Sequence, residues 1–263
     1  MNRAKSAEAG LSAGSTRSAG LLQSTAAVTQ FAVLDALLAG AYESGITVDD
    51  VRAAGNFGIG CCEHLGGEVV IIDGEVFECT VDAPPVRMSG AQVLPFVDVC
   101  HLPAAASAAG QIEDSDLATF TERVEVGLVS RNLFHAVRVD GEFTSVRVRI
   151  TARQDHPARP LAEVTHEQIE TVITDTSGTL VGFWSPAIYQ GIAVAGLHLH
   201  YIADDRSVGG HVLDVTVRSA SLVLAAYARF ELQLPTDPQF LNTELTHDDD
   251  HRIVAVEAGG ASR

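Results

Sequence analysis

Short β-rich runs joined by tight turn signals are the feature that most constrains the fold of this chain. Two such runs, 68–72 and 75–79, flank the dipeptide Asp73–Gly74. An Asp-Gly pair between β-rich runs is typical of a two-residue hairpin turn. The same arrangement recurs around Asp140–Gly141, so we expect a second hairpin there. The sequence therefore favours antiparallel strand pairs over a regular alternation of strands and helices.

More β-rich segments follow in the C-terminal part of the chain, with only short helices between strands. The β-rich segments are 179–184, 192–202, 211–218 and 221–232. Helical spacing and capping residues predict four helices, which run from Ser24 to Gly40, from Thr47 to Gly55, over 115–123 and over 165–173. We therefore expect an α+β fold with large mixed or antiparallel sheets.

The length of 263 residues allows one large domain or two small ones. The first 24 residues are mostly Ala, Ser and Gly, and we expect a disordered tail over 1–24. The segment RQDHPARP, residues 153–160, is the best candidate for a boundary. This gives an N-terminal α+β half over 25–155 and a C-terminal β-rich half over 156–263.

Charge and hydropathy argue against several classes of partner. Acidic residues outnumber basic residues by 34 to 17, and the formal net charge is −17. Nucleic acids and anionic membranes both reward clustered Lys and Arg, so we expect neither as a partner. No apolar run reaches the roughly 18 residues that a membrane span needs. The four cysteines form no CxxC pair and no secretory disulfide pattern, which favours a reducing cytoplasm.

Three histidines close together form the most informative stretch of the sequence. Residues two apart in a strand face the same side, so His198 and His200 project together. Asp204–Asp205 and Gly209–Gly210 supply turn residues, and a hairpin would bring His211 to the same face. Three neutral imidazoles can hold a catalytic zinc ion and leave a position open for water or substrate. Iron, manganese or nickel would also accept three nitrogen ligands, and a solvated pair of surface histidines is the structural alternative.

The histidines belong to a longer, ordered motif. It reads Gly196-x-His198-x-His200-x-x-x-Asp204-Asp205-Arg206-x-x-Gly209-Gly210-His211-Val212-Leu213-Asp214. Accompanying segments are GTLVGFWSP at 178–186, NLF at 132–134, PF at 95–96, and FGIG at 57–60 leading to Gly67–Glu68. Together these segments resemble the α-acetolactate decarboxylase family over about residues 25–263.

The resemblance implies conversion of 2-acetolactate to acetoin and carbon dioxide, with zinc held by the three histidines. Arg149 matches the family's active-site arginine, although Arg147 shares its strand face and spacing alone does not separate the two. Glu68 and Glu257 match two active-site glutamates, the second on a C-terminal tail that returns to the site. We assign the acid/base work, protonation of the enediolate left by loss of carbon dioxide, to both glutamates jointly. The resemblance also implies an α+β fold in two β-rich halves, with a few short helices, and a homodimer.

Three departures from the family pattern lie near these residues. Gly60–Cys61–Cys62 stands where Gly-Thr-Phe is usual, so a thiol replaces a hydroxyl. Gly66 stands where an aspartate is usual, so a neighbouring carboxylate is missing, and Ala152 replaces a proline. None of them removes a proposed metal ligand, but the first two could alter substrate preference or rate.

Two other functions stay open. A cupin-type metal dioxygenase or isomerase also begins from H-x-H on a strand, but it commonly adds a glutamate ligand where this chain has Asp204. A non-catalytic β-rich module would use the histidines as a structural metal site with a fourth protein ligand. Iron with oxygen consumption would indicate the first alternative. Unfolding on metal removal, without turnover, would indicate the second.

Overall fold

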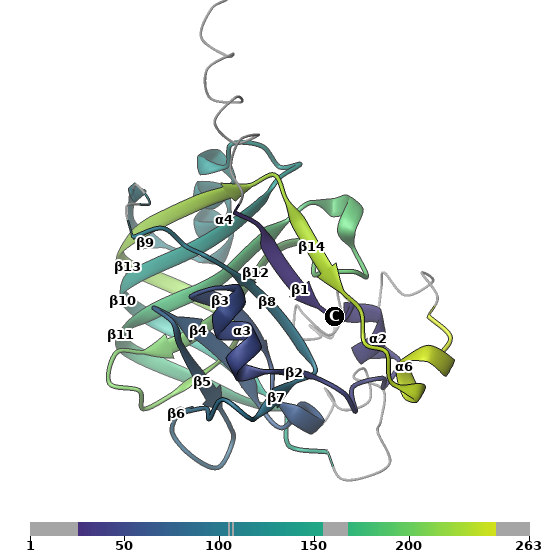
Figure 1. Cartoon of the computed structure of the whole chain (residues 1–263). Helices are drawn as coiled ribbons and strands as arrows, with labels where there is room; N and C mark the ends of the chain where they lie inside the picture. The colour runs from purple at the N-terminus through teal and green to yellow at the C-terminus, as the bar shows by residue number, and fades with distance from the viewer. Residues whose placement is uncertain (1–25, 105, 107, 155–167, 246–263) are drawn as a thin grey trace, which may run out of the picture.

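Two packed β-sheets form the body of the protein. The structure, a computed structural model, describes residues 26–104, 106, 108–154 and 168–245 (Figure 1). One hydrophobic cluster joins the facing sides of the two sheets, and it includes Phe57, Ile59 and Val70 from the first sheet and Val181, Phe183 and Ile202 from the second. The α+β class predicted from the sequence is confirmed, since strands dominate and the helices are few and short.

The first sheet has seven strands in the order β14-β1-β8-β3-β4-β5-β6. Their bounds are β14 Phe230–Gln233, β1 Val28–Phe31, β8 Phe96–Cys100, β3 Phe57–Cys61, β4 Glu68–Ile72, β5 Glu75–Cys79 and β6 Val86–Arg87. All neighbours are antiparallel except β1 and β14, which run parallel. A separate pair joins β2 (Ile46–Thr47) and β7 (Val93–Leu94).

The second sheet is built from long strands in the order β10-β11-β12-β13-β9. Their bounds are β10 Phe134–Ile150, β11 Ile169–Ser185, β12 Gly196–Ala203, β13 Gly209–Tyr227 and β9 Ala108–Ser115. β10 also pairs with β13, so the hydrogen-bonded ladder from β10 to β13 closes on itself. This closure brings the start of β13 between β12 and β10, where the candidate site lies.

Short helices pack around the two sheets. They are α2 (Leu34–Leu38), α3 (Val48–Ala54), η1 (Glu63–Leu65), α4 (Leu117–Gly127), η3 (Ala187–Tyr189) and α6 (Pro238–Asn242). α3 begins as predicted at Thr47, whose hydroxyl accepts from Asp50 N at 3.2 Å, and α6 packs beside α2 (Figure 1). Within the described residues, no helix is long and apolar enough to cross a membrane.

Local turn chemistry predicts the first hairpin correctly but not the second. Asp73 and Gly74 have φ of 53° and 83° and join β4 to β5 as expected. Asp140 and Gly141, in contrast, lie inside the continuous strand β10, which has partners on both sides. A Cβ on Gly141 would lie 2.3 Å from Ser219 O, so this glycine serves the close approach of β13 and not a turn.

Long-range pairing also overrides two of the predicted helices. Residues 28–31 form β1 between β14 and β8, and only Leu34–Leu38 of the expected first helix is helical. Residues 169–173 belong to β11, and 165–167 lie outside the described residues. The two strands expected within 211–232 are one long strand, β13, followed by the separate β14.

Both sheets take strands from each side of residues 153–160. β9 and β10 precede this segment and belong to the second sheet, whereas β14 follows it and belongs to the first. The halves 25–155 and 156–263 therefore stay a prediction about chain segments and do not correspond to the two sheets. The tail over 1–24 lies outside the described residues.

Candidate metal centre

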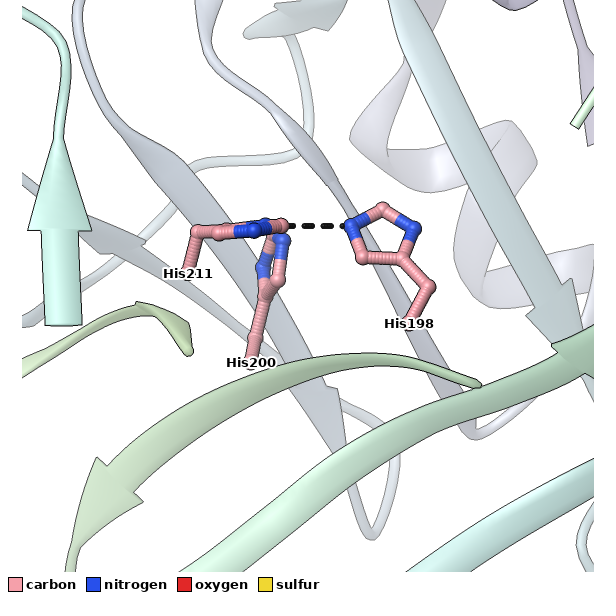
Figure 2. A group of neighbouring side chains, drawn as sticks. All are labelled: His198, His200 and His211. Carbon is pink, nitrogen blue, oxygen red and sulfur yellow. Dashed lines mark hydrogen bonds between the residues drawn. The ribbon is translucent and has the colours of Figure 1, made fainter. Parts of the chain in front are cut away.

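The three histidines of the sequence motif lie together in one pocket. His198 and His200 project from β12, and His211 lies opposite His200 in the register of β12 and β13 (Figure 2). One ligand atom from each of the three lies within 4.8 Å of the other two. Nε2 of His198 and Nδ1 of His211 are 3.1 Å apart. The predicted convergence of H-x-H with the third histidine is therefore confirmed.

Two glycines let the chain reach this arrangement. Gly210 has a φ of 157°, and a Cβ there would lie 2.9 Å from Arg149 O on β10. A Cβ on Gly209 would lie 2.6 Å from Cys79 Sγ on the first sheet. Side chains at either position would push β13 away from its neighbours. The Gly-Gly pair thus holds His211 close to β12 and to the first sheet.

The first sheet fixes the orientation of His200. Its Nδ1 lies 2.9 Å from the Val69 carbonyl of β4, and because a carbonyl only accepts, Nδ1–H is the donor. The lone pair of His200 is therefore on Nε2, which lies 3.5 Å from Glu68 Oε2. A backbone acceptor behind the ring is the usual partner of a histidine that binds metal.

Burial keeps two of the imidazoles neutral. Desolvation, followed by the positive charge of Arg149, lowers the pKa of His198 to about 3. Desolvation also holds the pKa of His200 well below its ordinary value. Neutral imidazoles offer lone pairs at neutral pH, and three nitrogen donors are a set that first-row transition metals accept. The three residues therefore fit a metal ion and could hold one.

Arg149 lies beside the histidines, and Arg147 does not. Arg149 is 4% exposed and pairs in register with His211. Arg147 forms an ion pair with Glu170 at 3.1 Å and is partly exposed. The register between β10 and β13 shifts between Arg147 and Val148, which separates the surroundings of the two arginines. Strand alternation alone could not distinguish them, whereas the bulge does.

The pocket holds most of the predicted site residues and several that sequence reasoning missed. It has an empty volume of about 470 Å³, part of it open to solvent, and its walls include Glu68, Arg149, Cys61 and the three histidines. Leu34, Leu37, Leu65, Phe96 and Thr151 also line it and were not predicted as site residues. Leu34 and Leu37 have the helical spacing of ordinary core residues, so the sequence carries no signal for their place in the pocket, whereas Phe96 lies in a segment that resembles the family. Glu257 lies outside the described residues.

Comparison with known proteins gives consistent matches in sequence and in structure. The family described as "Alpha-acetolactate decarboxylase" matches residues 28–247. The alpha-acetolactate decarboxylase of Methanosarcina mazei is 35% identical over 229 residues, which cover 87% of this chain and 79% of that protein. The Bacillus subtilis enzyme is 31% identical over 244 residues, which cover 90% of this chain and 92% of that protein. The crystal structure of the B. subtilis strain 168 enzyme has a TM-score of 0.84 and covers 88% of this chain and 99% of that one.

Proposed function

The chain belongs to the alpha-acetolactate decarboxylase family, and we propose that it converts 2-acetolactate to acetoin and carbon dioxide with a zinc ion at His198, His200 and His211. The observation that carries this proposal is the pocket itself. It gathers three histidine nitrogens, a buried arginine and a buried glutamate within a chain of this family. Three imidazoles with an open position are the usual ligand set of catalytic zinc.

The reaction requires charge stabilisation on oxygen. Breaking the bond between C2 and the carboxylate leaves an electron pair that moves onto the adjacent carbonyl to form an enediolate. A zinc ion bound by the histidines would supply a Lewis acid for the vicinal hydroxyl and keto oxygens, a contribution of several kcal/mol. The Val69 carbonyl serves this chemistry indirectly, because it holds His200 Nδ1–H and keeps Nε2 available.

Arg149 is proposed to bind the carboxylate of the substrate. Its planar guanidinium suits a carboxylate, and the surrounding burial strengthens a charge-assisted hydrogen bond. The Gln168 side chain accepts from Arg149 Nη1 at 3.3 Å, which helps to orient the guanidinium. A local positive group of this kind can capture an anion even though the whole chain has a net charge of −17.

Glu68 is proposed to share the proton transfer with Glu257. After carbon dioxide leaves, one proton must reach a carbon of the enediolate to give acetoin. Glu68 is 8% exposed and its carboxylate lies next to His200, within the pocket. Glu257 keeps its proposed role through the family resemblance alone, and the division of labour between the two carboxylates stays open.

The deciding experiment measures acetoin formed from racemic 2-acetolactate above the spontaneous rate. The purified protein is assayed as isolated, after treatment with a chelator, and after adding back zinc, iron, manganese or nickel. Loss with chelator and recovery with zinc would support the proposal, whereas recovery with another metal alone would correct the zinc assignment. A folded, metal-loaded protein that forms no acetoin would contradict the proposed reaction.

The same samples test the two alternative functions. Oxygen consumption by an iron-loaded sample would support a cupin-type dioxygenase. A metal whose removal unfolds the protein, without turnover of any 2-hydroxy-3-keto acid, would support a structural module.

We also propose a homodimer and a cytoplasmic location. The dimer follows from the family resemblance, and light scattering of the purified protein would measure it directly. All four cysteines are free thiols, which suits a reducing compartment.

A further inference from the structure

The lining of the pocket includes residues of opposite chemistry. A polar wall from the second sheet carries the three histidines and Arg149. The rest of the lining includes Glu68 and four apolar residues, Leu34, Leu37, Leu65 and Phe96, which we call the apolar wall. All four apolar residues are at most 4% exposed and belong to one hydrophobic cluster. The proposed reaction uses the polar wall and Glu68 and leaves the apolar wall without an assigned role.

Leu34 and Leu37 occupy one face of α2, three residues apart, and α2 is held in place at its start. The buried Gln30 side chain donates through Nε2 to Ala32 O at 2.7 Å and to Ile192 O at 2.8 Å. Leu34 N also donates to Ile192 O, at 3.0 Å. These bonds fix the turn that leads into α2, so the two leucines cannot move aside easily.

Leu65 is held by contacts with the segment that follows β10. The Thr151 hydroxyl donates to Leu65 O at 2.5 Å, and Gln154 N donates to the carbonyl of His64 at 2.9 Å. Both contacts join η1 to residues 151–154, which directly follow β10 and lie close to Arg149 in the sequence. The distance between the apolar wall and the arginine is therefore set by backbone anchors.

A substrate of the proposed kind has apolar groups that match this wall. In 2-acetolactate the carboxylate suits Arg149, and the hydroxyl and keto oxygens suit the histidine side of the pocket. Two methyl groups remain, and they gain most by leaving water against apolar side chains. A rigid, well-packed wall accepts an extra methylene poorly, because overpacking displaces neighbouring side chains.

We propose that Leu34 and Leu37 set the size of the alkyl groups that the site accepts on its substrate. This inference rests on the proposed function and adds the residues that determine its specificity. A fixed hydrophobic pocket discriminates one methylene by roughly 10- to 200-fold in kcat/KM. Shortening either leucine should remove much of that discrimination.

The test compares kcat/KM for two homologous series, one extended at the 2-alkyl group and the other at the acyl group. Leu37→Ala and Leu34→Ala are compared with the wild type on the methyl, ethyl and propyl members. We expect the ratio of ethyl to methyl activity to rise by about tenfold or more in at least one series. Leu38→Ala is the matched control, because Leu38 is 2% exposed on the same helix and in the same cluster but does not line the pocket.

Leu38→Ala should lose stability and keep the wild-type ratio. If a pocket variant does not fold, Leu37→Val removes less volume and answers the same question. An unchanged ratio in folded Leu37 and Leu34 variants would overturn the inference, provided that the wild type still makes acetoin. Failure of the wild type itself to make acetoin would instead reject the proposed function.

Discussion

Two groups of buried polar side chains lie between the same two sheets, and they differ in how their polar atoms are satisfied. The histidine cluster draws partners from both sheets, since Val69 O and Glu68 of the first sheet face His200 of the second. Asp98 on β8 lies opposite Gln30 on β1. Within the described residues, Asp98 Oδ1 and Gln30 Oε1 have no hydrogen-bond partner. The first group opens into a pocket, and the second is enclosed.

One proton would satisfy the enclosed pair. The amide nitrogen of Gln30 already donates to two carbonyls, so its unpartnered oxygen is left as an acceptor on the residue opposite Asp98. Burial raises the pKa of Asp98 to about 7, and a neutral carboxyl can donate. We therefore expect Asp98 to donate to Gln30 Oε1. The histidine cluster is thus available to bind a ligand, whereas Gln30 and Asp98 help to hold the start of α2. Variants can separate the two roles.

The largest effect on activity is expected from substitutions in the histidine cluster. His200→Ala removes one of three nitrogens, so metal content and acetoin formation should fall together, the activity by roughly a thousandfold or more, as loss of several kcal/mol implies. Metal analysis and the acetoin assay measure the two properties on one sample. His101→Ala is the control, because His101 is exposed and distant in sequence from the motif. Full activity in His200→Ala would refute the three-histidine assignment.

A smaller effect is expected at the arginine beside the cluster. Arg149→Lys keeps the charge but loses the planar fork, so KM should rise by about 10- to 100-fold if a charge-assisted hydrogen bond to the carboxylate is lost. Steady-state kinetics on 2-acetolactate measures this change. Arg147→Lys on the same strand should stay within about twofold of the wild type, since an exposed ion pair contributes little. Equal effects of the two substitutions would contradict the assignment to Arg149.

The sequence predicts the histidine cluster far better than it predicts the residues around that cluster. Strand alternation and a turn at 204–208 bring the three histidines together through local rules, although Gly209–Gly210, expected in the turn, lies in β13, and Asp73–Gly74 makes a hairpin by the same rules. Arg149 is distinguished from Arg147 only by a register shift against β13, which no local pattern specifies. The roles of Leu34 and Leu37 depend on the anchoring of α2 to residue 192, far away in the chain.

The sequence does not predict the pair of Asp98 and Gln30, and it mispredicts two strands, for the same physical reason. Asp98 faces Gln30 because β1 pairs with β8 over a long sequence separation, and those residues of β1 look helical by local spacing. Asp140–Gly141 carries a hairpin signal, but partners on both sides hold it within one continuous strand. Long-range pairing decides these positions, whereas the histidine motif is nearly contiguous.

The pH dependence of stability tests the enclosed pair. The pKa of Asp98 is raised in the folded state, so folding retains a proton that the unfolded chain releases near its ordinary pKa of about 4. The free energy of unfolding of the wild type should therefore fall, relative to Asp98→Asn, as pH rises from about 4 to about 7, by at most roughly 1.4 kcal/mol per pH unit. The amide introduced by this substitution keeps a donor for Gln30 and has no proton to lose in this range. Urea unfolding of both proteins across this range gives the difference, and a difference independent of pH would show that Asp98 is ionised in the fold.

The smallest effect is expected at Cys61, which lies where the two groups meet. Cys61 pairs with Phe96 and Glu68 in register and lines the pocket, while Ile59 on the same strand lies opposite Asp98. Cys61→Thr replaces the thiol by a hydroxyl of similar reach and leaves the three histidines intact, so metal content should not change. One added neutral hydrogen bond contributes about 1 kcal/mol, so kcat/KM on 2-acetolactate should change by less than about tenfold. A larger change, or loss of metal, would mean that the thiol takes part in the metal site and that the polar wall extends onto β3.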